Sequence, residues 1–164
     1  VFLLSFAIER MRPATAQIAF WIYAALVGVS LASIFMVFTH TSIVRVFFIT
    51  AASFGALSLW GYTTQRDLTG MGSFLLMGLF GVILASIVNI FMASSMLQFI
   101  ISVVGVLVFA GLTAYDTQRI KDGYYELMSD GSALAKGAIM GALSLYLDFI
   151  NMFTMLLSLF GNRE

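Results

Sequence analysis

The chain consists of long apolar runs separated by short polar joints. A helix needs ~20 residues to cross the ~30 Å hydrocarbon core of a bilayer, and five runs reach about that length. They cover residues 14–38, 43–63, 71–92, 97–115 and 137–160, and a sixth, partial helix covers residues 1–9. The runs are apolar on every side, which excludes the period-two strands of a membrane β-barrel. The pattern therefore predicts an all-α, polytopic membrane bundle that forms a single transmembrane domain over residues 1–164.

The composition agrees with a membrane protein and narrows the chemistry. Hydrophobic residues make up 61% of the chain and charged residues only 10%, whereas about 25% of an ordinary soluble domain is charged. Eight basic and eight acidic side chains leave no net charge, so nothing favours nucleic acid as a partner, and the lipid bilayer is the expected one. The chain has no cysteine, and His40 is its single histidine, which excludes disulfides, a thiolate nucleophile and a zinc site.

The basic residues predict the orientation of the bundle. Short cytoplasmic loops of membrane proteins retain Lys and Arg. The joints on one face are flanked by Arg10, Arg12, Arg66, Arg119, Lys121 and Lys136, and those on the other face only by Arg45 and Arg163. We therefore expect the 119–136 loop to be cytoplasmic and the C-terminus to lie on the other side of the membrane.

The last apolar run has a polar stripe along one side. Small and polar residues recur there at spacings of four and three: Gly137, Gly141, Ser144, Asp148, Asn151, Met155 and Ser158. Residues at these spacings share one face of a helix, and small residues in membranes mark the faces on which helices pack together. The stripe predicts that Asp148 points into the bundle. Asn89 belongs to a similar stripe in the run 71–92.

Two carboxylates are the candidates for chemistry. An ionised Asp in hydrocarbon is expensive, so Asp148 is a functional candidate by default. Asp116 ends the run 97–115, and both acids lie toward the cytoplasmic side if the two helices are neighbours. Two carboxylates ~4 Å apart repel by ~4 kcal/mol at an effective dielectric of ~20. The pair would share a proton at low pH and separate, or recruit a cation, at higher pH, which makes it a pH switch and a candidate for weak Ca²⁺ binding.

Each acid also has a structural explanation. Asp116 could sit among the lipid headgroups and pair with nearby Arg119 or Lys121. Asp148 could be a buried polar clamp that is hydrogen-bonded to Ser144 or Asn151. These alternatives stay open at the level of the sequence.

The remaining polar candidates have similar alternatives. Arg10 follows an apolar helix, so its side chain either extends to the interface or reaches inward to a carboxylate. Asn89 and Asn151 most often serve as hydrogen-bonding links between helices.

Three segments carry a family resemblance. The segments "GLTAYDTQRIK" and "ALSLYLDFINMF", together with "RDLTGMGSFLLMGL", resemble the signature of the transmembrane Bax inhibitor motif family in its bacterial branch. The resemblance covers nearly the whole chain. It implies a seven-helix fold whose last helix is central, a place in the bacterial inner membrane, and a chain that lacks the first helix and part of the second.

The resemblance also implies a function. Members form a pH-sensitive Ca²⁺ leak channel that is controlled by two aspartates on the sixth and seventh helices, which match Asp116 and Asp148. An arginine at the end of the second helix can latch to this pair; Arg10 is the best match, and Arg12 competes with it. Ion transport of this kind needs Ca²⁺ and protons but no resident cofactor.

Two other functions are alternatives to a leak channel. Bacterial members of the family are also associated with a membrane-bound quality-control protease, which they bind and restrain without transport. An intramembrane aspartyl protease would itself need two carboxylates. However, the segment before Asp148 reads "SLYLD" rather than Gly-x-Gly-Asp, and the chain has no Pro-Ala-Leu element. We therefore expect a protein that is not an enzyme.

Overall fold

The computed structural model describes residue 10 and residues 12–161, except for the side chain of residue 35, and these residues form helices joined by short connections. The helices are α2 (Pro13–Leu31), α3 (Ile34–Val37), α4 (His40–Thr63), α5 (Thr69–Met92), α6 (Ser95–Leu127) and α7 (Gly131–Phe160). All except α3 are long and apolar enough to cross a membrane. The prediction of an all-α membrane bundle is confirmed. The partial helix expected at residues 1–9 lies outside the described residues.

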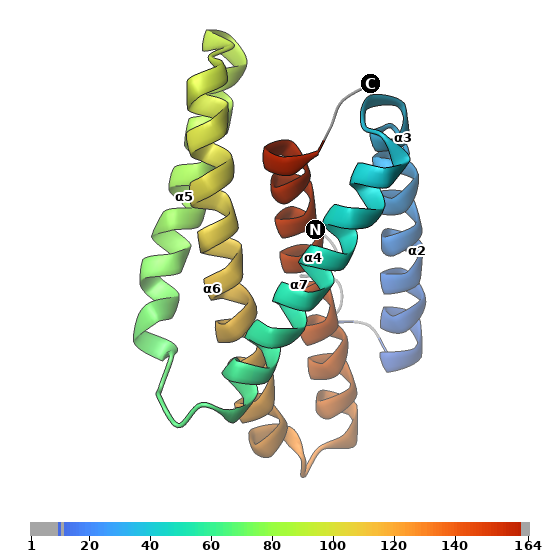
Figure 1. Cartoon of the computed structure of the whole chain (residues 1–164). Helices are drawn as coiled ribbons and strands as arrows, with labels where there is room; N and C mark the ends of the chain where they lie inside the picture. Colours follow the sequence, from blue (N-terminus) through green and yellow to red (C-terminus); the bar gives the residue numbers. More distant parts are fainter. Residues whose placement is uncertain (1–9, 11, 162–164) are drawn as a thin grey trace.

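The long helices alternate in direction, so the connections gather at two ends of the bundle. The start of α2, the α4–α5 connection and the α6–α7 connection lie at one end, and the α3–α4 and α5–α6 connections lie at the other (Figure 1). We call the first the basic end, because it carries Arg12, Arg66 and Lys136. We call the second the opposite end. This arrangement agrees with the alternation of basic joints along the sequence; the side of the membrane that each end faces stays a prediction.

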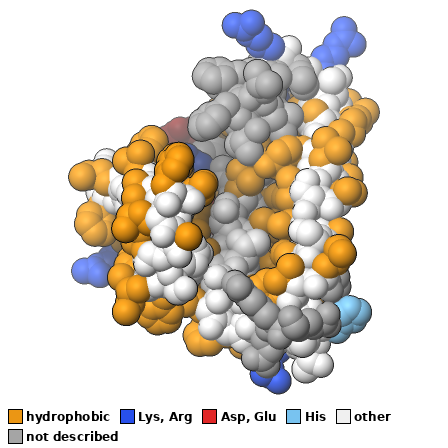
Figure 2. Space-filling model, turned by 90° about the horizontal axis from the view of Figure 1, so that it is seen from above, with side chains coloured by type: hydrophobic (Ala, Val, Ile, Leu, Met, Phe, Trp, Pro, Cys, Tyr) orange, Lys and Arg blue, Asp and Glu red, His pale blue; other side chains and the backbone are white. Residues whose placement is uncertain are grey.

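Helices α6 and α7 each pack against three other helices. Helix α7 packs against α2, α4 and most extensively α6, while α5 packs mainly on α6. The centre of the bundle is a cluster of buried apolar side chains that includes Val46, Phe109, Met152 and Leu157. Large apolar side chains cover much of the outer surface instead, as the view along the bundle shows (Figure 2). An apolar exterior of this kind is what a surrounding lipid phase requires.

The run predicted as one helix over residues 14–38 is broken. Helix α2 ends at Leu31 and the short α3 follows after two residues. The hydroxyls of Ser30 and Ser33 donate to the carbonyls of Leu26 and Ser30. Hydroxyl groups that bond to backbone carbonyls compete with the helical pattern, which accounts for a break that hydropathy does not show.

The prediction of a loop over residues 119–136 is wrong. Helix α6 continues through Asp116 to Leu127, α7 begins at Gly131, and only residues 128–130 connect them. Hydropathy marks where the apolar layer ends, whereas the helices continue because they pack on each other: Gly141 lies against Ile120, and Gly137 lies against Leu127. Asp130 then accepts hydrogen bonds from the first N–H groups of α7, as a helix N-cap does.

The other helices begin two or three residues before their predicted positions at 43, 71 and 97. The side chains of Thr39 and Ser94 cap α4 and α6 by accepting backbone hydrogen bonds. Polar capping residues, rather than the first apolar residue, set the starts of α4 and α6, whereas α5 has no side-chain cap.

Candidate functional site: a cavity with two buried aspartates

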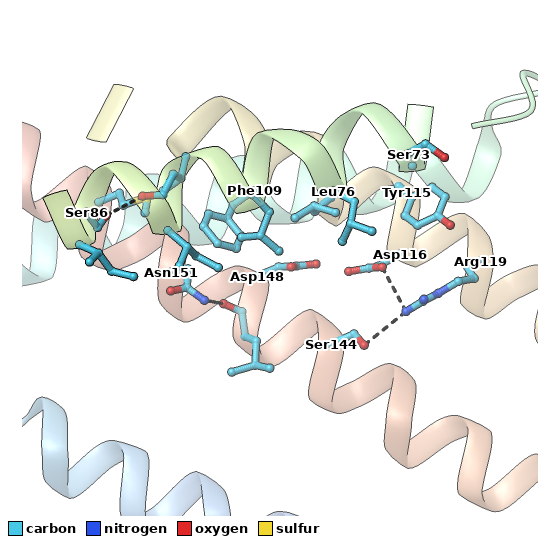
Figure 3. A pocket seen from close by; sticks show the side chains of 18 of the residues that line it. Ser73, Leu76, Ser86, Phe109, Tyr115, Asp116, Arg119, Ser144, Asp148 and Asn151 are labelled. Carbon is cyan, nitrogen blue, oxygen red and sulfur yellow. Dashed lines mark hydrogen bonds and ion pairs between the residues drawn. The ribbon is translucent and has the colours of Figure 1, made fainter. Parts of the chain in front are cut away.

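Helices α6 and α7 bring the two predicted acids together. Asp116 and Asp148 point toward one another in the close view (Figure 3), and they are close enough to interact electrostatically. Their exposed fractions are only 7% and 5%. The prediction that Asp116 ends its helix is wrong, because α6 continues to Leu127 and carries this carboxylate inside the bundle.

The acids face a cavity of about 870 Å³ between α5, α6 and α7, which we call the acid cavity. On α5 its lining runs from Thr69, near the basic end, to Ile90, near the opposite end. Most lining side chains are apolar, but Ser73 and Ser86 of α5 add hydroxyl groups. Sequence reasoning missed these two serines because single hydroxyl groups are common in apolar helices. Among the described lining residues, α5 contributes no charge.

One arginine joins the two helices beside the acids. The guanidinium of Arg119 lies 3.2 Å from Asp116 Oδ1 and donates to Ser144 Oγ at 3.4 Å. It also lies 5.8 Å from the centre of the Tyr115 ring. The side chain of Arg119 is 56% exposed, so it links the buried pair to the water at the basic end. The ion pair of Asp116 with Arg119, one of the alternatives predicted from the sequence, is therefore present, with a buried carboxylate and a half-exposed guanidinium.

Asp148 has no such partner. Its Oδ2 atom is buried and makes no hydrogen bond with the described residues. The alternative of a polar clamp, in which Asp148 bonds to Ser144 or Asn151, is absent at this atom. Ser144 is bonded to Arg119, and the amide of Asn151 donates to the carbonyl of Leu147. A buried charge without a partner costs several kcal/mol. Asp148 must therefore carry a proton, or meet a cation or water from the cavity.

The predicted latch residue lies elsewhere. Arg10 and Arg12 are exposed near the start of α2, and within the described part of the chain neither forms an ion pair with either aspartate. In this structure it is Arg119 that lies beside the acid pair. The i, i+3 spacing of Asp116 and Arg119 was the sequence signal for it.

The other predicted supporting residues divide between two roles. Gly137 and Gly141 hold the α6–α7 contact near the basic end. Asn89 donates from α5 to Gln98 of α6 at 3.2 Å, which is the predicted link between helices, but it lies at the opposite end, away from the acids. Asn151 lines the acid cavity and bonds only within its own helix.

The site offers few ligands for a resident metal. No group of three or more His, Cys, Asp or Glu side chains converges anywhere in the described ranges. Ca²⁺ takes about six to eight oxygen ligands in proteins. Asp116 and Asp148, with the hydroxyl of Ser144, supply only part of that number, so any Ca²⁺ at this site would keep much of its water.

Gln118, two residues after Asp116, holds the α4–α5 connection against α6. Its Oε1 accepts the N–H of Leu68 at 2.8 Å, and its Nε2 donates to the carbonyl of Arg66 at 2.6 Å. Both Gln118 and Leu68 are buried. The sequence gives no signal for this role, because the partners of Gln118 are backbone groups distant in the chain.

Replacing Gln118 with Ala should lower the free energy of unfolding by about 1–3 kcal/mol, because the buried N–H of Leu68 loses its acceptor. Chemical unfolding in detergent micelles measures this change. Gln17→Ala is the control: it removes an amide from an exposed position of α2, where we expect less than about 1 kcal/mol. Equal losses in the two variants would contradict the assigned role.

The helices and the acid cavity together define a class: a multi-pass helical membrane protein with an intramembrane carboxylate site. The comparisons with known proteins then give the family. The family model for "Inhibitor of apoptosis-promoting Bax1" matches residues 1–164, and the chain belongs to this Bax inhibitor family. The resemblance found in the sequence motifs is thereby confirmed.

Several bacterial relatives are similar over nearly the whole chain. An uncharacterized protein of Caulobacter vibrioides is 53% identical over 160 residues, which are 97% of this chain and 64% of the relative. An uncharacterized protein of Rickettsia prowazekii is 53% identical over 94% of this chain and 65% of its own length. The inner membrane protein YbhL of Escherichia coli K12 is 49% identical over 100% of this chain and 70% of its own length. The chain thus spans about two thirds of the length of these relatives.

Proposed function

We propose that this protein is a pH-sensitive leak channel for Ca²⁺ in the bacterial inner membrane, with Asp116 and Asp148 as its proton sensor and gate. The observation that carries the proposal is the buried, unpartnered Oδ2 of Asp148, which faces Asp116 in a cavity of about 870 Å³. The motif resemblance supports the choice of Ca²⁺ and of these two residues.

The charges around the cavity explain how protons act. Arg119 compensates one carboxylate, that of Asp116. With a proton on Asp148 the site is neutral, and α6 and α7 stay together. Loss of that proton leaves one uncompensated negative charge in an apolar setting, which is expensive. A hydrated cation entering the cavity, or separation of the two carboxylates, relieves it. Raising the pH therefore opens the route.

The proposed orientation places the basic end in the cytoplasm. Its support is the gathering of basic residues at that end. A place in the inner membrane is supported by the name of the Escherichia coli relative. The acid pair then lies nearer the cytoplasm, and protons would reach it from that side, where the side chain of Arg119 is exposed.

The direct test is Ca²⁺ uptake into proteoliposomes between about pH 5 and pH 8, a range in which coupled carboxylates and their partners titrate. We expect uptake that rises with pH, with protein-free liposomes as the baseline. Uptake at the baseline throughout would contradict the leak and would favour the alternative, a regulator that binds and restrains a membrane-bound quality-control protease. Co-purification of such a protease, unchanged by Asp148→Asn, would then identify that function.

A further inference from the structure

A second cluster of polar side chains lies at the opposite end, on the same three helices. Asn89 of α5 donates to Gln98 of α6 at 3.2 Å, Gln98 donates to Ser102 at 3.4 Å, and Ser102 Oγ lies 3.5 Å from Ser158 Oγ of α7. These four residues line a cavity of about 420 Å³, which we call the opposite-end cavity. Gln98 is exposed whereas Ser102 is only 1% exposed, so the chain of hydrogen bonds leads from the surface into the bundle.

The two cavities follow each other along the same helices. On α7 the lining of the acid cavity ends at Met155, and that of the opposite-end cavity includes Ser158. On α6 the corresponding residues are Phe109 and Ser102. On α5 the two linings meet, because the acid cavity reaches Ile90 and the opposite-end cavity includes Asn89. About one helical turn separates the two linings on α7, because residues three apart are successive on one face of a helix.

An apolar contact between α6 and α7 lies at the level between the two linings on these helices. The side chain of Met155 lies directly on Gly105 of α6: a Cβ atom at Gly105 would overlap the sulfur and come within 2.7 Å of Cε. Methionine is unbranched and flexible, so it can leave such a position by changing rotamers. Apolar constrictions between wet cavities block ions by excluding water.

We propose that the opposite-end cavity is the second, water-filled mouth of the cation route, and that the contact of Met155 with Gly105 is the barrier between it and the acid pair. This inference rests on the proposed leak, and it extends the route from the acid cavity to the other side of the membrane. The described residues that line this mouth are uncharged. Neutral oxygens bind a hydrated cation weakly and release it fast, which conduction requires.

The alternative explanation is that this polar cluster only links the helices in a dry interior. Thiol labelling separates the two, because the chain contains no cysteine. A charged, membrane-impermeant thiol reagent is added from the side that the opposite end faces, and Ser158→Cys is compared with two controls. His40→Cys is the exposed control at the same end, and Met152→Cys is the control buried in α7, where only 1% of the side chain is exposed.

We expect Ser158→Cys to react at least about tenfold faster than Met152→Cys, since only a thiol in water ionises to the reactive thiolate. Labelling no faster than that of Met152→Cys would overturn the water-filled mouth. The measurement needs no ion flux, so it gives its answer whether or not the proteoliposomes take up Ca²⁺. The uptake experiment can therefore contradict the Ca²⁺ leak while labelling shows water in the opposite-end cavity. Uptake can also support the leak while labelling shows a dry cavity.

The barrier has its own labelling test. Asn151 lines the acid cavity beyond Met155 as seen from the opposite end, so Asn151→Cys should react slowly with reagent added from that side. Adding Met155→Ala should speed this reaction several-fold, whereas Met155→Leu, which keeps the apolar bulk, should not. Folding of each variant is checked by its elution as a single species in detergent. Equal rates with Ala and Leu at position 155 would overturn the barrier.

Discussion

Asp148→Asn should abolish the pH dependence of Ca²⁺ uptake and hold the flux at its low, acidic value throughout the range. Asparagine has nearly the shape of a protonated aspartate but cannot ionise. The remaining carboxylate, Asp116, is already compensated by Arg119 at 3.2 Å. No uncompensated charge then appears as the pH rises, so nothing draws a cation into the acid cavity or separates α6 from α7. Uptake into proteoliposomes at matched protein density measures the effect.

The matched control is Asp122→Asn. It removes a carboxylate from the same helix, but from an exposed position outside the lining of the acid cavity. Surface charges contribute little, since water and salt screen them. We expect this variant to keep the pH profile of the unmodified protein. A profile for Asp148→Asn that still rises with pH would remove Asp148 from the gate.

The sequence was sufficient for the membrane bundle and for the two acids. The lengths of the apolar runs are tied directly to the thickness of the bilayer, so five crossings could be predicted. Asp148 stands out because a charge in an apolar run is rare. The stripe around it was a correct guide as well, since Ser144, Asp148, Asn151 and Met155 all line the acid cavity.

The partners of these residues could not be predicted in the same way. Hydropathy ended a helix at residue 115, but packing of Ile120 against Gly141 continues it. That continuation places Arg119 on a helix beside Asp116, where it takes the position expected for Arg10. Gln118 was missed because its partners are backbone groups distant in the chain. Asn89 and Ser158 were predicted, but not that Gln98 and Ser102 join them, because Ser102 and Ser158 are distant in the chain. Contacts of this kind depend on how the helices are arranged, which a single sequence does not state.

Asp116→Asn should have the reverse effect of Asp148→Asn and shift the rise of Ca²⁺ uptake to lower pH. The variant removes the negative charge that faces the carboxyl group of Asp148, whereas Arg119 keeps its hydrogen bond to Ser144 and forms no ion pair with Asp148 among the described residues. At an effective dielectric of about 20, two charges about 4–8 Å apart interact by about 2–4 kcal/mol. Each pH unit corresponds to about 1.4 kcal/mol, so we expect a shift of at least about one unit.

Arg119→Gln should shift the rise of Ca²⁺ uptake in the opposite direction. Without the cation, ionisation beside Asp116 becomes harder, so the rise in uptake should move to higher pH. The shift should be smaller, about half a unit, because exposed ion pairs contribute about 1 kcal/mol or less. Lys121→Gln is the control, since its ammonium group bonds to the carbonyl of Tyr62 and lies outside the lining of the acid cavity. Shifts in the same direction for Asp116→Asn and Arg119→Gln would show that the two residues stabilise the fold rather than set the charge at Asp148.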